Sequence, residues 1–167
     1  EVFSWIACIV VTILLTEFIL NFVIINANIP SGSMENTIMT NDKLIALRTS
    51  YWFNDPKRGD IIIFKYPDDE TEWFIKRVIA LPGETVLVKD GKVYINGSKK
   101  ALSEPYIKEE PVEDFGPYKV PKNGYFVMGD NRNNSNDARE WETHYVSRDE
   151  VLGKAWFRYY PSIKVIK

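Results

Sequence analysis

The chain has 167 residues, enough for one domain with a sizeable core, and its formal net charge is -2. This charge provides no basic face, so we expect no nucleic-acid partner. With one cysteine, Cys8, in an apolar run and one histidine, His144, the sequence predicts no metal site and no disulfide in the rest of the chain.

The N-terminal run Val2–Ile25 is apolar at 19 of its 24 positions, which is long enough for a helix across a bilayer. Glu17 and Asn21 interrupt the run, and we expect Glu17 to lie near one interface or to be protonated. A cleavable signal peptide is the alternative, but the run has no basic segment before it and exceeds the usual apolar length of such peptides. We therefore predict a transmembrane anchor at residues 1–25, a lipid bilayer as partner, and one folded domain at residues 26–167.

Short runs of β-forming residues recur after the anchor. Asp90-Gly91 in the middle of one run predicts a hairpin. Ser98–Asn123, rich in Pro, Glu and Lys, predicts a long excursion with little regular structure. No helical period recurs outside the anchor, so the predicted fold class is mainly β. The predicted strand regions are Ile61–Tyr66, Trp73–Leu81, Thr85–Ile95, Gly124–Gly129 and Gly153–Tyr160.

Two serines, Ser31 and Ser33, flank Gly32 shortly after the anchor. They either form a simple turn or include a nucleophile at the membrane surface. His144 lies in a polar stretch, where a lone histidine is more often structural, so we expect no Ser-His-Asp triad. A nucleophilic serine would then need a lysine as its base, which is a known variant.

A lysine base requires its pKa to fall from about 10.4 to about 7–8, and burial among apolar groups is the usual cause. Lys65 and Lys164 lie in apolar runs but border charges or the chain end, so we expect both to reach water. Strand alternation places Lys76 on the same face as Phe74 and Val78. Lys76 is therefore the best placed of the three lysines for a base, and the pattern equally fits a lysine that protects an edge strand from aggregation.

A polar segment, Gly129–Trp141, is dense in Asn, Asp, Gly and Arg. Its spacing does not match a calcium-binding EF-hand loop, and Arg132 and Arg139 disfavour a cation site. The segment is either a plain solvated loop or a loop held rigid by ion pairs beside an active site.

Taken together, these segments resemble the bacterial type I signal peptidases, in the compact form of Gram-positive bacteria. The resemblance implies a largely antiparallel β catalytic domain and a membrane-bound serine–lysine endopeptidase without cofactor. It further implies secretory preproteins with small residues at positions -1 and -3 as substrates, and a single-pass cell-membrane location with the catalytic domain on the extracytoplasmic face. The blocks that carry the resemblance are Ile29–Met34 (IPSGSM), Arg58–Pro67 (RGDIIIFKYP), Phe74–Glu84 (FIKRVIALPGE) and Gly129–Arg139 (GDNRNNSNDAR).

The resemblance also implies roles for individual residues. Ser33 would be the nucleophile and Lys76 the general base, with the Ser31 hydroxyl and the Ser33 backbone N–H as oxyanion donors. Ser135 would hydrogen-bond and orient Lys76. Structural support through ion pairs is implied for Arg77, Asp130, Arg132, Asp137 and Arg139. Contact with substrate is implied for Ile29, Pro30, Met34, Ile38, Phe74 and Ile75.

Three positions depart from the family pattern: Asn133 replaces a frequent Asp, Ala138 a frequent Ser, and Ala27 a bulkier residue in some members. Tyr51–Phe53 is interpreted either as an interfacial membrane contact or as ordinary core. A self-cleaving serine–lysine repressor is disfavoured by the apolar anchor. A non-catalytic membrane-anchored paralogue, acting in pilus or surface-protein assembly, would be expected to lack the serine or the lysine.

Overall fold

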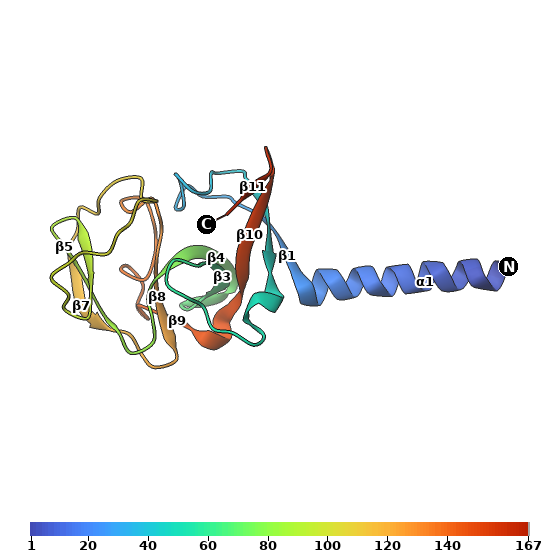
Figure 1. Cartoon of the computed structure of the whole chain (residues 1–167), viewed down its shortest axis with the longest axis horizontal. Coiled ribbons are helices and arrows are strands. Elements are labelled where there is room, and N and C mark those ends of the chain that lie inside the picture. The colour runs from blue at the N-terminus through green and yellow to red at the C-terminus, as the bar shows by residue number, and fades with distance from the viewer. Residues whose placement is uncertain (167) are drawn as a thin grey trace.

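The computed structural model describes residues 1–166, in which one long helix leaves a β domain (Figure 1). Helix α1 (Val2–Phe18) continues through a π-helical turn, η1 (Ile19–Val23), into strand β1 (Ile24–Asn28). The two helical segments form one candidate membrane span of 22 residues, Val2–Val23, with none of it buried in the protein. At 1.5 Å per residue this span is about 33 Å long, which matches the hydrocarbon core of a bilayer, about 30 Å thick.

The helical part ends two residues before the Ile25 predicted from the sequence. Ile24 and Ile25 instead pair with Leu47 and Ala46 of the next strand, and Ile25 is buried in the β domain. Apolar residues fit a membrane helix and a buried strand equally well, so hydropathy could not locate this end.

The polar residues inside the helix are satisfied locally. The hydroxyls of Thr12 and Thr16 donate to carbonyl oxygens one turn earlier. The Asn21 amide donates to the Glu17 carbonyl oxygen at 2.8 Å and to its carboxylate at 3.1 Å. These bonds reduce the cost of placing the polar groups in hydrocarbon.

The main sheet has the antiparallel order β1-β2-β10-β3-β4-β8-β9, with β11 paired to β10. The predicted mainly β, antiparallel fold is confirmed. Short 3-10 helices, η2 (Arg48–Tyr51) and η3 (Arg148–Glu150), follow β2 and β9. The strands after β1 are β2 (Lys43–Leu47), β3 (Ile61–Tyr66), β4 (Asp69–Ala80), β8 (Gly124–Met128), β9 (Val146–Ser147), β10 (Val151–Tyr160) and β11 (Lys164–Val165).

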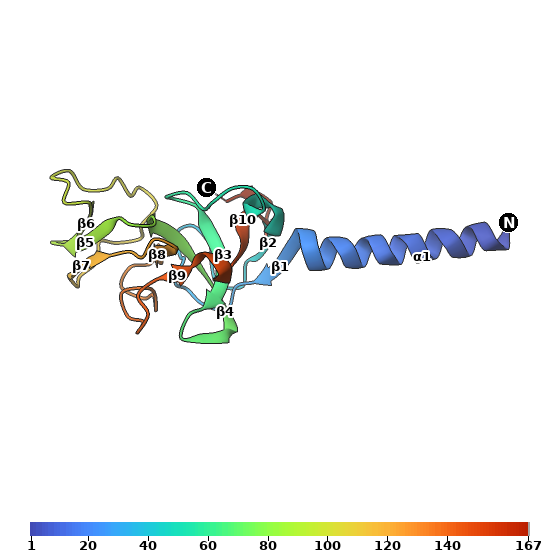
Figure 2. The same ribbon diagram turned by 90° about the horizontal axis from the view of Figure 1, so that it is seen from below.

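A second, three-stranded sheet lies at the end of the molecule opposite the helix (Figure 2). It consists of β5 (Thr85–Lys89), β6 (Lys92–Ile95) and β7 (Phe115–Lys119). The predicted hairpin at Asp90-Gly91 is present, with φ values of 49° and 74° at these two residues. Strand β7 lies within Ser98–Asn123, which otherwise has little regular structure, as predicted.

The core consists of two apolar clusters that share strands β3 and β4. Alternate residues of β3 enter different clusters, as a strand period of two requires, and β4 contributes Ile75 to one cluster and Val78–Ala80 to the other. Ile61, Ile63 and Ile75 face the cluster that includes the segment after β1. Ile62 and Val78 face the larger cluster. Side chains on both faces of β4 are therefore fixed by packing.

The aromatic residues Tyr51–Phe53 agree with each of their two interpretations in part. Tyr51 is buried in the larger cluster, whereas Trp52 and Phe53 are exposed, Phe53 at 91%.

Candidate active site

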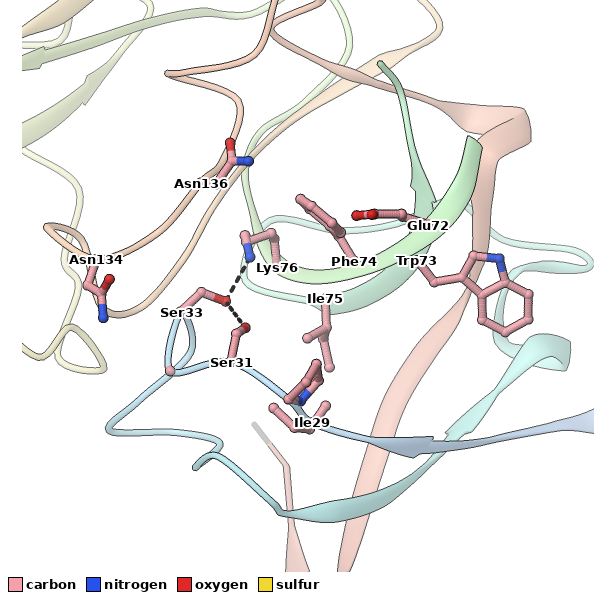
Figure 3. Close-up of a pocket in the computed structure, with 12 residues that line it drawn as sticks. Ile29, Ser31, Ser33, Glu72, Trp73, Phe74, Ile75, Lys76, Asn134 and Asn136 are labelled. Atoms are coloured by element: carbon pink, nitrogen blue, oxygen red, sulfur yellow. Dashed lines mark hydrogen bonds between the residues drawn. The ribbon is translucent and has the colours of Figure 1, made fainter. Parts of the chain in front are cut away.

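The structure brings Ser33 and Lys76 together (Figure 3). Ser33 follows β1 in the segment that turns over the end of the sheet, and Lys76 lies in β4. The Lys76 Nζ donates a hydrogen bond to the Ser33 Oγ at 2.8 Å. Both residues are buried, Ser33 at 6% and Lys76 at 4% exposure. The pair has the geometry of a nucleophile and its base, which must lie within about 2.6–3.2 Å.

The surroundings of Lys76 disfavour its charged form. Its cross-strand partner is the fully buried Ile62, and its Nζ lies 5.2 Å from the centre of the Phe74 ring. Burial lowers the pKa of Lys76 from 10.5 to about 8, although the carboxylates of Asp137 and Asp130 act in the opposite direction. Desolvation outweighs the two carboxylates, so the amine is available as a base at mildly alkaline pH.

Ser31 stands at the exposed rim beside the pair. Its Oγ lies 3.4 Å from the Ser33 Oγ. This hydroxyl is therefore next to the point where a carbonyl carbon would be attacked.

A cavity of about 520 Å³ opens in front of the pair. A smaller one of about 250 Å³ follows β1 and shares its walls at Ile29, Pro30 and the segment Trp73–Ile75. Together they form an apolar groove between β1 and β4 that leads to Ser33. The residues around the larger cavity are Ile29, Pro30, Ser31, Gly32, Ser33, Glu72, Trp73, Phe74, Ile75, Lys76, Asn134 and Asn136.

A buried ion pair joins β4 to the loop after β8. Arg77 donates from Nε and Nη2 to the two carboxylate oxygens of Asp130, at 2.8 Å and 2.7 Å. The Thr37 hydroxyl, from the segment that carries Ser33, also donates to Asp130. Asp130 thus connects the base strand with the nucleophile segment.

The sequence model of one family, "Signal peptidase, peptidase S26", matches residues 2–160 of the chain. The chain belongs to this signal peptidase family. It is 48% identical over 141 residues to a signal peptidase I of Leptolyngbya laminosa, an alignment that covers 80% of this chain and 67% of the relative. It is 35% identical over 177 residues to a signal peptidase I of Bacillus licheniformis, with coverage of 100% and 93%.

A crystal structure of a signal peptidase I from Enterococcus faecalis V583 is also similar, with a TM-score of 0.52 and 36% identity. The match covers 60% of this chain and 97% of that one. At this identity the similarity extends beyond the fold to the family.

Two further ion pairs stiffen the polar loop of this signal peptidase. Asp137 binds Arg139 at 2.9 Å and accepts from the Gly129 N–H at 2.9 Å. Arg132 binds Glu104 through two nitrogens, at 2.6 Å and 3.0 Å. Because Asp130, Asn131, Arg132 and Asp137 are all buried, the interpretation of a plain solvated loop is wrong.

The residue Asn131, which the sequence did not single out, holds the nucleophile turn. Its backbone N–H donates to the Ser33 carbonyl oxygen at 3.1 Å. Its side-chain amide donates to the Gly32 carbonyl oxygen at 2.9 Å. Among the residues around the cavity, Glu72, Trp73, Asn134 and Asn136 were also not foreseen. Alternation along β4 placed Trp73 on the face opposite Lys76 and gave no sign that it reaches the groove.

The structure differs from the expected contacts at three of the residues. The Ser135 hydroxyl is buried and has no hydrogen-bond partner within residues 1–166, so the expected bond to Lys76 is not formed. Met34 and Ile38 are buried in the core and do not border either cavity, because the turn after Ser33 directs them inward against the β1 side of the sheet.

Lys65 and Lys164 reach solvent, as predicted.

A metal centre would need several His, Cys, Asp or Glu side chains close together. Within the described chain, no group of three or more His, Cys, Asp or Glu side chains could hold a metal ion. The His144 ring has a structural hydrogen bond, since its Nδ1 lies 2.8 Å from the Ala138 carbonyl oxygen.

Replacing Gly129 with alanine is expected to impair cleavage more than folding. A Cβ at this position would overlap the Ser33 carbonyl oxygen and the Ser135 side chain. The backbone oxygen cannot yield without moving the nucleophile, and overpacking of this kind typically costs about 1–3 kcal/mol. Measuring kcat and the melting temperature together checks this. A Gly129→Ala enzyme with unchanged kcat would contradict it.

Proposed function

We propose that this chain is a membrane-anchored endopeptidase that removes signal peptides through a Ser33–Lys76 dyad. The family membership supports the removal of signal peptides from secretory preproteins. The observation that carries the dyad is the 2.8 Å contact between Ser33 Oγ and a buried amine whose pKa falls to about 8.

The dyad performs acyl transfer in two steps. The neutral Lys76 amine accepts the Ser33 proton as Oγ bonds to the carbonyl carbon of the substrate. The resulting ammonium donates this proton to the leaving amine when the C–N bond breaks, which leaves an ester on Ser33. Lys76 then takes a proton from water as the water attacks the ester, and Ser33 is released with its proton restored.

The negative charge on the tetrahedral oxygen requires hydrogen-bond donors. We assign this role to the Ser31 hydroxyl and the Ser33 backbone N–H. The position of Ser31 Oγ, 3.4 Å from Ser33 Oγ, supports the assignment. Loss of one such donor typically costs about 3–4 kcal/mol in the transition state.

The substrate binds as an extended strand in the groove between β1 and β4. Within residues 1–166, strand β1 pairs with β2 alone, so its other edge has free backbone groups for a peptide. Ile29, Pro30, Phe74 and Ile75 line the groove close to Ser33. These apolar walls admit small side chains at alternate positions, which supports the preference for small residues at -1 and -3.

The anchor holds the active site at the bilayer. Residues 1–25 are assigned as the anchor, with the helix itself ending at Val23, and residues 26–167 as the catalytic domain. We assign a single-pass cell-membrane location with the catalytic domain on the extracytoplasmic face, where signal peptides emerge from translocation.

The pH dependence of cleavage tests the dyad. Protonated Lys76 cannot act as a base, so kcat/KM of the full-length enzyme in detergent should fall about tenfold per pH unit below an apparent pKa near 8. Cleavage of a preprotein is measured from pH 5 to pH 10, with circular dichroism at each pH to verify folding. A rate that stays constant down to pH 5 would exclude Lys76 as the base.

A further inference from the structure

A separate cavity of about 320 Å³ lies at the junction between the helix and the β domain. It shares no lining residue with the groove that leads to Ser33. Its walls come from the last helical turn, from η2 and the residue after it, from η3 and from the start of β10. The residues around it are Asn21, Phe22, Arg48, Tyr51, Trp52, Arg148, Val151 and Leu152.

The charge in this junction cavity is entirely positive. It contains two arginines and no carboxylate among its lining residues. The Arg48 Nε is buried without a hydrogen-bond partner, and its guanidinium forms no hydrogen bond or ion pair with residues 1–166. Its nearest aromatic contact is the Trp73 ring, at 5.8 Å. Arg48 as a whole is only partly buried, so an anion can reach its guanidinium and give the buried Nε the partner that it lacks.

The second arginine is fixed at the cavity edge. Arg148 donates to the Tyr51 carbonyl oxygen at 2.6 Å and to the Asp55 carboxylate at 2.9 Å. Asp55 is 78% exposed and does not border the cavity, so water weakens its compensation of the charge. Both guanidinium groups therefore favour an anion in the space between the helix and η2.

The position of the cavity identifies the source of the anion. Asn21 and Phe22 belong to the last turn of the candidate membrane span, so the cavity lies where the hydrocarbon ends and the headgroups begin. Trp52 and Phe53 are exposed beside it, and aromatic side chains favour this interfacial level. Lipid phosphates are the abundant anions at that depth.

We propose that the junction cavity binds the phosphate group of an anionic phospholipid, with Arg48 as the principal donor. A planar guanidinium donates two parallel hydrogen bonds to a phosphate, which suits an arginine whose Nε has no hydrogen-bond partner in the protein. The proposal depends on the membrane anchoring described above and is independent of the dyad. The bound lipid would fix the β domain relative to the helix.

The test measures lipid binding to the full-length chain carrying Ser33→Ala, in neutral detergent. Dihexanoyl phosphatidylglycerol, dihexanoyl phosphatidylcholine and inorganic phosphate are titrated separately, and bound molecules are counted by native mass spectrometry. We expect saturable binding of phosphatidylglycerol, at least tenfold weaker binding of phosphatidylcholine, and a rise in melting temperature with the anionic lipid. Arg48→Gln should weaken phosphatidylglycerol binding at least tenfold. Lys92→Gln removes the same charge from the distant β6 and should bind like the parent.

Phosphatidylglycerol binding that survives Arg48→Gln overturns the proposal. Inorganic phosphate that binds as tightly as the lipid also overturns it, in favour of a free-anion site. If Arg48→Gln fails to fold, the parent protein decides the matter, because 1 M NaCl should abolish the rise in its melting temperature with the anionic lipid. Flotation with phosphatidylcholine vesicles reports the anchor separately, and cleavage assays report the dyad, so the three failures are distinguishable.

Discussion

Lys76→Met is expected to abolish signal-peptide cleavage and, at neutral pH, to make the folded domain more stable. Methionine fills similar space without a charge or a proton acceptor. Loss of the general base should reduce kcat at least about 10³-fold. The gain in stability arises because the wild-type fold buries an ammonium whose pKa falls from 10.5 to about 8, a cost of roughly 3 kcal/mol.

The stability difference between Lys76→Met and wild type should depend on pH in a defined direction. The unfolded lysine binds its proton more tightly than the folded one, so the cost is complete below pH 8 and disappears as pH rises to 10.5. The stability advantage of Lys76→Met over wild type should therefore shrink between pH 8 and pH 10.5. Denaturant unfolding of both proteins at several pH values measures it.

Ser33→Ala is the matched control for this experiment. It should lose cleavage to a similar extent, since the nucleophile is gone, yet retain the buried lysine and show no comparable gain in stability. A Lys76→Met protein that still cleaves a preprotein would exclude the dyad. One that is less stable than wild type at pH 7 would show that the lysine is not destabilising as a buried ammonium.

Asp130→Ala is expected to lower the free energy of unfolding by about 3–5 kcal/mol, the usual cost of removing one partner of a buried ion pair. Arg77 is 2% exposed and Asp130 fully buried, so the guanidinium would lose a carboxylate that accepts from two of its nitrogens, in a place that water does not reach. The Thr37 hydroxyl would lose its acceptor as well. For a chain of this size the melting temperature should fall by roughly 10 °C.

Glu70→Ala provides the comparison at an exposed pair. Lys65 and Glu70 lie 3.1 Å apart with their side chains 41% and 63% exposed, so this change should cost less than about 1 kcal/mol. Equal melting temperatures for the two variants would contradict a structural role for Asp130. In the folded fraction of Asp130→Ala, loss of a carboxylate that raises the Lys76 pKa should also shift the acidic limb of cleavage to lower pH.

Much of the fold could be predicted from local patterns. Alternation, the Asp90-Gly91 turn and the absence of a helical period predicted most strands of both sheets. The strands that were not predicted are β1, β2, β7, β9 and β11. A physical reason is visible for β1 and β7, which lack a local boundary or a local donor. Strand β1 continues the apolar run of the helix without a break, and β7 contains Pro117, which lacks a backbone N–H and is typical of a loop.

The sequence likewise predicted only part of the active site. Alternation along β4 predicted an apolar environment for Lys76, and the structure buries it as expected. The roles of Ser33 and Lys76 came from the resemblance and remain predictions until the variants are measured. What could not be predicted are contacts between distant segments, such as Arg132 with Glu104 and Asn131 with the nucleophile turn. No local spacing carries information about partners that meet only in the folded chain.

The direct continuation of the helix into β1 has a consequence for substrate choice. Ser33 follows Val23, the last helical residue, by ten positions, and the five residues of β1 between them span about 17 Å of rigid strand. In the proposed orientation, the rigid strand β1 therefore sets the height of the nucleophile above the bilayer. The enzyme would therefore select substrates by length. It would cleave only those preproteins in which the cleaved bond and the end of the apolar segment of the signal peptide are separated by a matching distance.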